Sequence, residues 1–508
     1  MKSFSLAVFV ALGATAVRAE VRLPALFSDN MVLQREKPVA VWGWADTGEK
    51  ITVKLGRSEA TTEARDGKWR VDLPKMKAGG PHTLTVSGAN SLTRTNVLLG
   101  EVWICSGQSN MEWPMVRTFE HGKAVQASKN SKIRLFTVPK LKANEPVEDI
   151  KSSWVFCEPG AVSNFSAVAY YFGRDLQKEL DVPVGLIHTS WGGSPAEVWM
   201  REETLAENPV YKTEILEEFS EQLKRYEDEL AKWEQEKVEL EREGKKITRN
   251  RPNLGWRPTE LYNGMIAPLV PFAIRGAIWY QGESNAGRAY QYRSLFADMI
   301  SNWRLDFGQG DFPFLLVQLA PWDKNRRREL AEITKAPGES DWAELREAQL
   351  LATKILPNVG MAVITDVGDK DDIHPTKKEP VGARLALAAR GVAYGEDVTY
   401  SGPIYRSLVI EGPRAIVSFD HTGRGLAAKG DELKGFAIAG ADRKFVWADA
   451  EIKGDTVIVS SPEVAHPVAV RYGWADFPVV NLFNKSGLPA SPFRTDNFPM
   501  VTGPKLKK

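Results

Sequence analysis

The sequence predicts an α/β domain with a parallel sheet, preceded by a β-sandwich and followed by a second β domain. Between residues 100 and 396, short apolar runs alternate with helical patterns, which is typical of buried parallel strands joined by helices. Before and after this region, apolar and polar residues alternate in short segments bounded by Gly, Pro and Asp. A chain of 508 residues has ample length for about three domains of ordinary size.

The first and last parts of the chain both have the period of β-strands. Residues 39–44 (VAVWGW) and 51–55 (ITVKL) alternate in this way, and Asp66-Gly67 between further runs is a strong hairpin signal. Residues 415–419 and 456–459 repeat the pattern near the other end. We therefore expect a β-sandwich domain over residues 20–99 and a C-terminal β domain over residues 397–508.

The middle region has the sequence pattern of buried parallel strands separated by helices. Apolar runs predict strands, and helical patterns such as residues 169–180 and 384–390 lie between them. These runs are residues 102–105, 184–187, 276–280, 314–317 and 361–364. We expect one catalytic α/β domain over residues 100–396.

A charged insertion interrupts this domain at about residues 211–251. Its apolar side chains recur at steps of four and three along a segment rich in Glu, Lys and Arg; they are Phe219, Leu223, Tyr226, Leu230 and Trp233. This heptad-like stripe predicts a protruding helical hairpin. It serves either as a solvated arm, as a dimerisation element or as a wall of the active site.

The first 19 residues predict a signal peptide. Lys2 is followed by an apolar stretch over residues 4–17 and by the small residue Ala19. The stretch is shorter than the roughly 20 residues that span a bilayer. We expect cleavage near Ala19 and an exported protein, periplasmic or extracellular.

Composition and charge exclude several classes of protein. The hydrophobic share of 43% and charged share of 26% exclude a disordered chain or a multispanning membrane protein. The net charge of +1 gives no indication of a nucleic-acid or anionic-membrane partner. The two cysteines, Cys105 and Cys157, are too few for a disulfide framework, and their redox state stays open.

Ser109 and His374 are the candidates for nucleophilic catalysis. Ser109 follows the strand-like residues 102–105, and His374 lies beyond the strand near residue 363, so both fall at the edge where ligands bind α/β sheets. A Ser hydroxyl becomes a good nucleophile when an adjacent base takes its proton. A carboxylate that holds the other ring nitrogen, such as Asp371, would leave Nε2 of His374 as that base.

Two further strand ends offer hydrogen-bond donors. Residues 189–194 (TSWGGS) bring glycines close to a ligand, and residues 280–285 (YQGESN) add side-chain amides. Acyl transfer needs donors aimed at the developing oxyanion, and both segments fit that need. No H-E-x-x-H or P-loop pattern occurs, and we expect neither a metal nor an organic cofactor.

Six segments taken together resemble the sialate O-acetylesterase family of the SGNH (GDSL-like) hydrolases. Four carry the site: residues 105–113 (CSGQSNMEW), 190–197 (SWGGSPAE), 279–285 (WYQGESN) and 371–375 (DDIHP). Residues 23–34 and 261–266 also match, so the resemblance covers nearly the whole chain except the charged insertion. It implies an SGNH-like three-layer α/β domain and an esterase of the Ser-His(-Asp) type.

The resemblance also implies roles for single residues. Ser109 matches the nucleophile, His374 the general base and Asp371 the D-x-x-H carboxylate, with Asp372 as the alternative. The Ser109 N–H and Gly193 match oxyanion donors. The superfamily's third motif carries an Asn where this chain has residues 281–285, so Gln281 is the favoured third donor and Asn285 the alternative.

The substrate that the resemblance implies is an O-acetylated sialic acid. Its carboxylate calls for a cation, and Arg288 and Arg275 flank the third motif; Arg288, Asn263 and Asn285 are the candidate substrate-binding residues. Acetylxylan or another acetylated polysaccharide is the alternative substrate, and a non-catalytic carbohydrate-binding protein is a more distant alternative. We expect no nucleic-acid or membrane partner, and the oligomeric state stays open.

Overall fold

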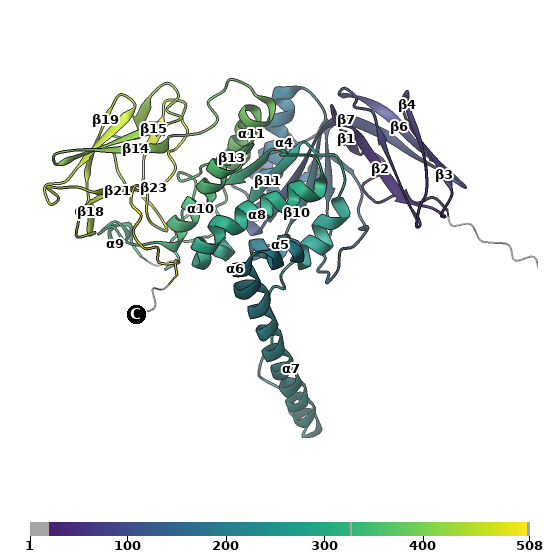
Figure 1. The fold of residues 1–508 in the computed structure, drawn as a ribbon, viewed down its shortest axis with the longest axis horizontal. Coiled ribbons are helices and arrows are strands. Elements are labelled where there is room, and N and C mark those ends of the chain that lie inside the picture. The colour runs from purple at the N-terminus through teal and green to yellow at the C-terminus, as the bar shows by residue number, and fades with distance from the viewer. Residues whose placement is uncertain (1–19, 326–327, 505–508) are drawn as a thin grey trace, which may run out of the picture.

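Three bodies stand in a row in the computed structural model, which describes residues 20–325 and 328–504 (Figure 1). The α/β domain lies in the middle, with one β domain at each end and a long helix projecting from the centre. This arrangement confirms the predicted fold class. The predicted signal peptide over residues 1–19 lies outside the described residues. Among the helices in the described part, none has the length and apolar character needed to cross a membrane.

The first β domain is a sandwich of two sheets. In one sheet β2 pairs with β5, and in the other β3, β4 and β6 connect to β7, which β1 joins in parallel. The strands are β1 (Val32–Gln34), β2 (Val39–Trp44), β3 (Lys50–Leu55), β4 (Ser58–Glu63), β5 (Lys68–Leu73), β6 (Gly79–Ser87) and β7 (Ser91–Gly107). Alternate residues such as Val41, Val53 and Val86 are fully buried between the sheets, as the period-two pattern requires.

Strand β7 joins the sandwich to the α/β domain without a break. Its first half pairs with β6, and its second half, from Glu101 onward, pairs with β10 and β11. The fully buried Glu101 carboxylate accepts hydrogen bonds from Arg35 of the sandwich and from Arg275 before β11, with Arg275 Nε at 2.6 Å. The boundary expected between residues 99 and 100 therefore falls inside one continuous strand.

The central sheet has the order β13-β12-β11-β7-β10-β8-β9. Its strands are parallel except for the edge strand β9. Besides β7 they are β8 (Asn130–Thr137), β9 (Val155–Cys157), β10 (Val184–Ser190), β11 (Gly276–Tyr280), β12 (Phe314–Val317) and β13 (Val359–Ala362). After β7 the chain forms β8, β9 and β10 on one side of it, and then β11, β12 and β13 on the other. Strand β7 therefore marks the switch point where ligands bind such sheets.

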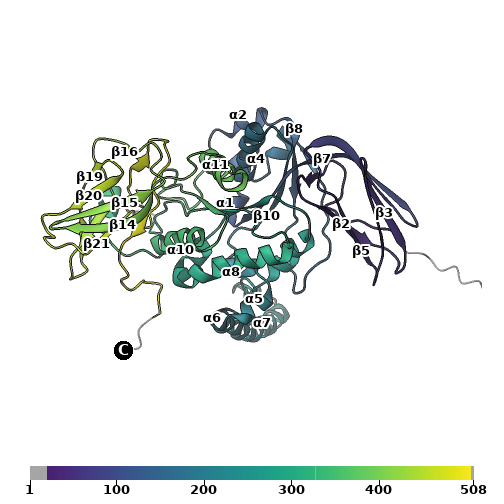
Figure 2. The same ribbon diagram turned by 45° about the horizontal axis from the view of Figure 1, so that its top comes forward.

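Helices cover both faces of this sheet (Figure 2). Helices α4 (Ala167–Leu180) and α11 (Glu379–Tyr394) pack on one face, and α8 (Ala289–Phe307) and α10 (Asp341–Ile355) on the other. Successive residues of β7 enter opposite cores, Trp103 with α4 and Ile104 on the side of α8. Burial on both faces explains why these strands are continuously apolar in the sequence.

The remaining helices are short and lie mostly in the loops around the sheet. The α-helices are α1 (Ser109–Glu112), α2 (His121–Gln126), α3 (Pro159–Val162), α5 (Glu202–Glu207), α6 (Pro209–Tyr211) and α9 (Leu330–Ile333). The 3-10 turns are η1 (Met115–Arg117), η2 (Ala196–Trp199), η5 (Ala267–Leu269) and η6 (Glu283–Arg288), and the π-helical turns are η3 (Lys212–Glu217) and η4 (Tyr262–Ile266).

The charged insertion forms one long helix with an extended return rather than a helical hairpin. Helix α7 (Glu218–Arg242) projects from the domain, and the chain runs back along it without regular structure (Figure 1). The return contacts the helix through the Trp233 indole, which donates to the Arg249 carbonyl at 2.9 Å. We call residues 211–258 the arm.

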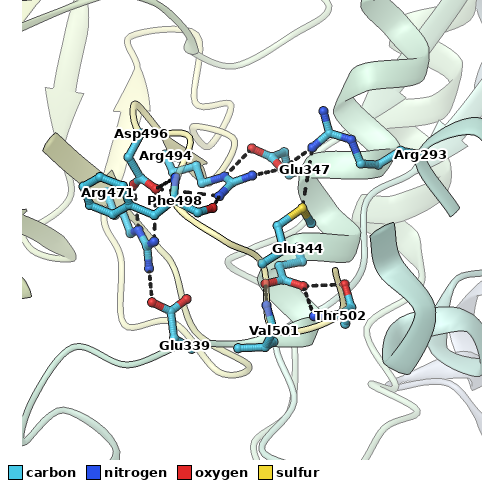
Figure 3. Close-up of polar contacts among 11 residues, drawn as sticks. Arg293, Glu339, Glu344, Glu347, Arg471, Arg494, Asp496, Phe498, Val501 and Thr502 are labelled. Carbon is cyan, nitrogen blue, oxygen red and sulfur yellow. Dashed lines mark hydrogen bonds and ion pairs between the residues drawn. The ribbon is translucent and has the colours of Figure 1, made fainter. Parts of the chain in front are cut away.

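The C-terminal β domain has its own core and docks onto helix α10. Its strands are β14 (Ile404–Glu411), β15 (Arg414–Asp420), β16 (Leu426–Ala428), β17 (Phe436–Ala439), β18 (Phe445–Trp447), β19 (Asp449–Lys453), β20 (Thr456–Ser460), β21 (Ala469–Tyr472), β22 (Leu482–Asn484) and β23 (Phe493–Arg494). Figure 3 shows the contact: Glu347 of α10 accepts from Arg494 and Arg293, and Glu344 accepts from the backbone of Val501 and Thr502.

The two cysteines are buried and unbonded to each other. Cys105 lies on β7, and Cys157 ends β9, where its thiol contacts the Ser128 carbonyl at 3.1 Å. Burial raises the pKa of the Cys157 thiol to about 12. Both side chains therefore pack as small apolar groups.

Candidate active site

A sharp turn at the end of β7 presents Ser109 at the edge of the sheet. Gly107 ends the strand with a φ of +138°, and a Cβ added there would stand 2.2 Å from the Tyr280 carbonyl oxygen. Only glycine allows this close passage beside β11. Ser109 then opens α1, with its side chain partly exposed.

His374 lies against Ser109 in hydrogen-bonding geometry. The distance between His374 Nε2 and Ser109 Oγ is 2.9 Å, although 265 residues separate them in the chain. The Trp113 ring stacks on the imidazole, with centroids 4.8 Å apart and planes 16° apart. This stacking holds the ring on the loop between β13 and α11, where Nε2 faces the hydroxyl. Sequence reasoning did not assign Trp113 a role, although the motif around Ser109 contains it.

The two aspartates before His374 lie differently. The Asp372 carboxylate accepts the backbone N–H of His374 at 2.9 Å and lies 3.5 Å from Nδ1 of the ring. Asp371, the residue expected to orient the ring, is exposed and accepts from Lys370 Nζ at 2.5 Å. The structure thus places the neighbouring carboxylate, Asp372, beside the imidazole.

Two backbone N–H groups of the site, those of Ser109 and Gly193, remain unused within the described residues. Gly192 contacts Ser109, since a Cβ added to Gly192 would stand 3.2 Å from Ser109 Cβ, and its own N–H donates to Glu112 at 2.6 Å. Gly193 follows with a φ of +77° and is exposed. Within residues 20–325 and 328–504, the N–H groups of Ser109 and Gly193 have no hydrogen-bond acceptor. They are the donors available for an oxyanion.

Gln281, expected as the third oxyanion donor, has internal partners for its side-chain amide. Its side chain is fully buried, and Nε2 uses its two hydrogens on the Ser194 carbonyl at 3.3 Å and on Asn285 Oδ1 at 2.6 Å. The Tyr292 hydroxyl donates to Gln281 Oε1 at 2.9 Å. Since Nε2 has only two hydrogens, Gln281 has none left for a ligand and instead braces the turn that carries Gly193.

The candidate substrate-binding residues are also engaged inside the protein. Asn285 is buried and donates to Glu197 at 3.0 Å, and Arg288 pairs with Glu197 at 2.5 Å and with Gln291 at 2.8 Å. The Asn263 amide donates to the Asn144 carbonyl at 2.9 Å. Arg275 precedes β11 and therefore lies at the opposite end of that strand from Gln281. All four side chains therefore have partners within the protein, and the Arg288 side chain is still 39% exposed.

A buried polar cluster supports the segments that carry Ser109 and His374. Asn110 donates to Glu283 at 2.6 Å and to the Ile373 carbonyl at 3.0 Å, and it accepts from Lys378 Nζ at 2.5 Å. Burial raises the pKa of Glu283 and lowers the pKa of Lys378 to about 7. The cluster ties the residue after Ser109 to the residue before His374.

His188 is a second histidine in this part of the sheet, and it is buried. Burial lowers the pKa of His188 to about 4, and this ring lies 2.6 Å from the Ser190 hydroxyl. Across residues 20–325 and 328–504, no three or more His, Cys, Asp or Glu side chains gather as a metal site would require.

Comparison with known proteins agrees with this geometry. The family described as carbohydrate esterase, sialic acid-specific acetylesterase, matches residues 99–240 and 238–390. The sialate O-acetylesterase of Mus musculus is 31% identical over 92% of this chain and 93% of its own length. The chain belongs to this family. The predicted resemblance is thereby confirmed, and the protein is an esterase.

Two further relatives extend the likeness over the whole molecule. The sialate O-acetylesterase of Homo sapiens is 29% identical over 93% of this chain and 92% of its own length. A crystal structure of a carbohydrate acetylesterase from Xanthomonas citri superposes with a TM-score of 0.81 at 40% identity, covering 94% of this chain and all of that one. The likeness to these two relatives therefore extends over both β domains of this chain.

Proposed function

We propose that the protein removes O-acetyl groups from sugars through an acetyl-enzyme intermediate on Ser109. The observation that carries this proposal is the 2.9 Å contact between Ser109 Oγ and His374 Nε2 at the edge of the sheet. A nucleophile and base in this geometry need only an oxyanion site and an ester to perform acyl transfer.

The reaction follows in two steps. Ser109 Oγ attacks the acetyl carbonyl carbon while Nε2 of His374 takes the hydroxyl proton, and the N–H groups of Ser109 and Gly193 bind the oxyanion. The bond to the sugar oxygen then breaks, and that oxygen takes the proton from Nε2. Water attacks the acetyl-enzyme in the same way, so acetate leaves and Ser109 regains its proton.

Asp372, rather than Asp371, orients His374 in this proposal. Its carboxylate lies 3.5 Å from Nδ1, so Nδ1 keeps its hydrogen and Nε2 keeps the lone pair that accepts the Ser109 proton. Gln281 positions Gly193 through the Ser194 carbonyl and does not contact the substrate.

The leading substrate is an O-acetylated sialic acid, because the matching family and the curated relatives carry that name. Lys140 and Lys142 supply cations near the site, at 5.4 Å and 5.9 Å from the Trp191 ring. Each ammonium group uses one donor, on Glu112 and Glu260 respectively, and has others for a sugar carboxylate.

A neutral acetylated polysaccharide is the second candidate substrate. The pairing of Lys140 and Lys142 with carboxylates, together with that of Arg288, leaves these six groups with no net charge. A balanced site attracts a neutral sugar as readily as an acidic one.

Acetate release by the wild type and by Ser109→Ala tests the proposal. The two substrates are 9-O-acetylated sialic acid and acetylated xylan, assayed in parallel. We expect turnover of the sialic acid ester by the wild type and a loss of at least about 10³-fold in Ser109→Ala. Turnover of xylan alone would keep the chemistry and replace the substrate, while a fully active Ser109→Ala would contradict the mechanism.

Export is the remaining part of the proposal, and it rests on residues 1–19. The basic start, the apolar stretch and Ala19 fit a cleaved signal peptide. Expression with these residues in a bacterial host should yield periplasmic protein whose first residue lies near Glu20. Full-length protein retained in the cytoplasm would contradict export.

A further inference from the structure

Two tryptophans form a corner next to the catalytic serine. Trp191 immediately precedes Gly192, which contacts Ser109, and its backbone N–H donates to Gly107 at 3.1 Å. The Trp256 indole nitrogen lies 3.9 Å from the position that a Cβ on Gly193 would take. The two rings meet nearly at a right angle, 87°, with centroids 5.5 Å apart.

The arm supplies the second wall of this corner. Trp256 lies at the end of the extended return from α7, after Gly255 with a φ of +78°. Next to it, Arg257 donates to Asn144 at 2.9 Å and lies 5.8 Å from the Phe219 ring at the base of α7. These contacts fix the return against both the helix and the loop after β8.

Both rings keep part of their surface exposed, with lysine ammonium groups beside them: Lys142 Nζ lies 4.2 Å from the Trp256 ring centroid, and Lys140 Nζ lies 5.4 Å from that of Trp191. Trp191 and Trp256 pack against the core on one side yet are only partly buried. Across the described residues neither indole N–H has an acceptor, and neither belongs to the fully buried, unpaired nitrogens such as that of Trp69. The exposed indole surface and the free indole N–H groups suit a pyranose, whose C–H face is apolar and whose hydroxyls accept hydrogen bonds from the indoles and from the flexible lysine ammonium groups beside them.

We infer that Trp191 and Trp256 bind the pyranose ring of the acetylated sugar, so that the base of the arm is part of the active site. The inference rests on the proposed function, because the corner lies beside the N–H groups of Ser109 and Gly193 that bind the acetyl oxyanion. The sugar occupies the corner while its acetyl group reaches Ser109. The two tryptophans bind the pyranose ring itself, so they bind acidic and neutral sugars alike.

Trp256→Ala tests the inference with two kinds of ester. One is the acetylated sugar that the wild type turns over, and the other is p-nitrophenyl acetate, which has the acetyl group but no pyranose. We expect kcat/KM for the sugar to fall by about tenfold, chiefly through KM, with less than about a twofold change for p-nitrophenyl acetate. Trp256→Phe, which keeps an aromatic ring, should lose less than Trp256→Ala.

Trp233→Ala is the matched control. It removes an indole from the same arm, about 21 Å along α7 from Phe219 at a helical rise of about 1.5 Å per residue. Both of its activities should equal those of the wild type. Thermal unfolding of all variants shows whether each one is folded.

The outcomes separate the inference from the proposed function. If Trp256→Ala loses activity on both esters equally, or keeps full activity on the sugar, the corner does not bind the ring and the inference is overturned. Ser109→Ala should be inactive on both esters. Activity in that variant would overturn the proposed mechanism itself, whatever Trp256→Ala shows.

Discussion

The two aspartates before His374 should differ in their effect on kcat. Asp372 lies 3.5 Å from Nδ1 and also holds the His374 backbone, whereas Asp371 faces Lys370 at 2.5 Å. We expect Asp372→Asn to lower kcat by roughly tenfold or more, because an amide no longer favours the imidazolium that forms in the transition state. Asp371→Asn should change kcat by less than about twofold.

Steady-state kinetics on one acetyl ester measure both variants. The contact at 3.5 Å is longer than a good hydrogen bond, so the loss in Asp372→Asn should be smaller than for a tightly bonded triad. A larger loss in Asp371→Asn than in Asp372→Asn would return the role to the D-x-x-H position.

Sequence reasoning located the segments of the site better than the orientation of their side chains. The carboxyl ends of parallel strands meet at one edge, and so Ser109 and Gly193 were expected to lie close together. Whether Gln281 faces the ligand depends on partners that no local pattern reveals. Tyr292 of α8 and Ser194 of the neighbouring turn occupy its amide and hold it inside.

At the scale of elements, the turn between β7 and α1 depends on one glycine. Gly107→Ala would place a methyl group 2.2 Å from the Tyr280 carbonyl oxygen at a φ of +138°. The backbone must move to relieve this clash, so we expect a loss of at least about 2 kcal/mol in unfolding free energy and a strong loss of activity.

Gly122→Ala serves as its control. Gly122 lies in helix α2, and an added Cβ would meet nothing within 4 Å. Alanine there should leave stability unchanged or raise it slightly, since it favours the helix. Chemical denaturation of both variants measures the contrast, and equal stability of the two would contradict the close packing of β7 on β11.

The unfolding free energy of the protein should depend on pH because of Lys378, which follows His374 in the chain and is buried. Burial lowers the pKa of this lysine from 10.5 to about 7, with Glu283 and Asp372 opposing that shift. Between these two values the unfolded chain binds a proton that the folded chain does not, so the unfolding free energy rises with pH in this window. The rise is at most about 1.4 kcal/mol per pH unit.

The comparison with Lys378→Gln isolates this contribution. Glutamine keeps a donor for Asn110 but does not titrate. Burial raises the pKa of Glu283, so the folded chain holds a proton there that the unfolded chain has lost, and this contribution to the unfolding free energy falls as pH rises. Glu283 is present in both proteins, so its contribution is common to them. Denaturation at pH 7, 8 and 9 should show the wild type gaining stability relative to Lys378→Gln. A constant difference across these values would contradict the prediction.

In the arm, the hydrophobic pattern predicted the helix but not the kind of segment that packs against it. The stripe from Phe219 to Trp233 predicted a helix correctly, and half-buried apolar faces usually pack on a second helix. Here an extended chain covers the stripe instead. The signal was present in the return itself, because Pro252, Gly255 and Pro258 do not favour a helix.

At the scale of the whole molecule, the three bodies are joined by different means. The sandwich shares β7 and the buried Glu101 with the α/β domain, and one continuous hydrophobic core runs through both. The C-terminal β domain has a separate core and contacts α10 through ion pairs and hydrogen bonds (Figure 3). We therefore expect the sandwich and α/β domain to unfold together and the C-terminal domain to depend on its polar contacts.

Glu347→Ala tests this difference in coupling. Glu347 accepts from Arg494 Nε at 2.8 Å and from Arg293 at 3.0 Å, and so it links the C-terminal domain to both α10 and α8. Alanine favours the helix, so any loss comes from the missing carboxylate, which leaves the buried Arg494 with fewer partners. We expect the unfolding free energy of the C-terminal domain to fall by about 2 kcal/mol. In calorimetry, the transition of this domain should move to lower temperature, while the transition of the sandwich and the α/β domain stays in place.

Glu451→Ala provides the comparison for that experiment. Glu451 pairs with Lys453 on an exposed strand of the same domain, and within the described part of the chain it has no ion pair with α10, so its removal should leave the thermogram unchanged. Activity of Glu347→Ala on the acetyl ester should stay at the wild-type value, because the Ser109 site belongs to the α/β domain. A single transition that moves as a whole would show that the C-terminal domain and the rest of the molecule unfold as one unit, with the polar contact strong enough to join two cores.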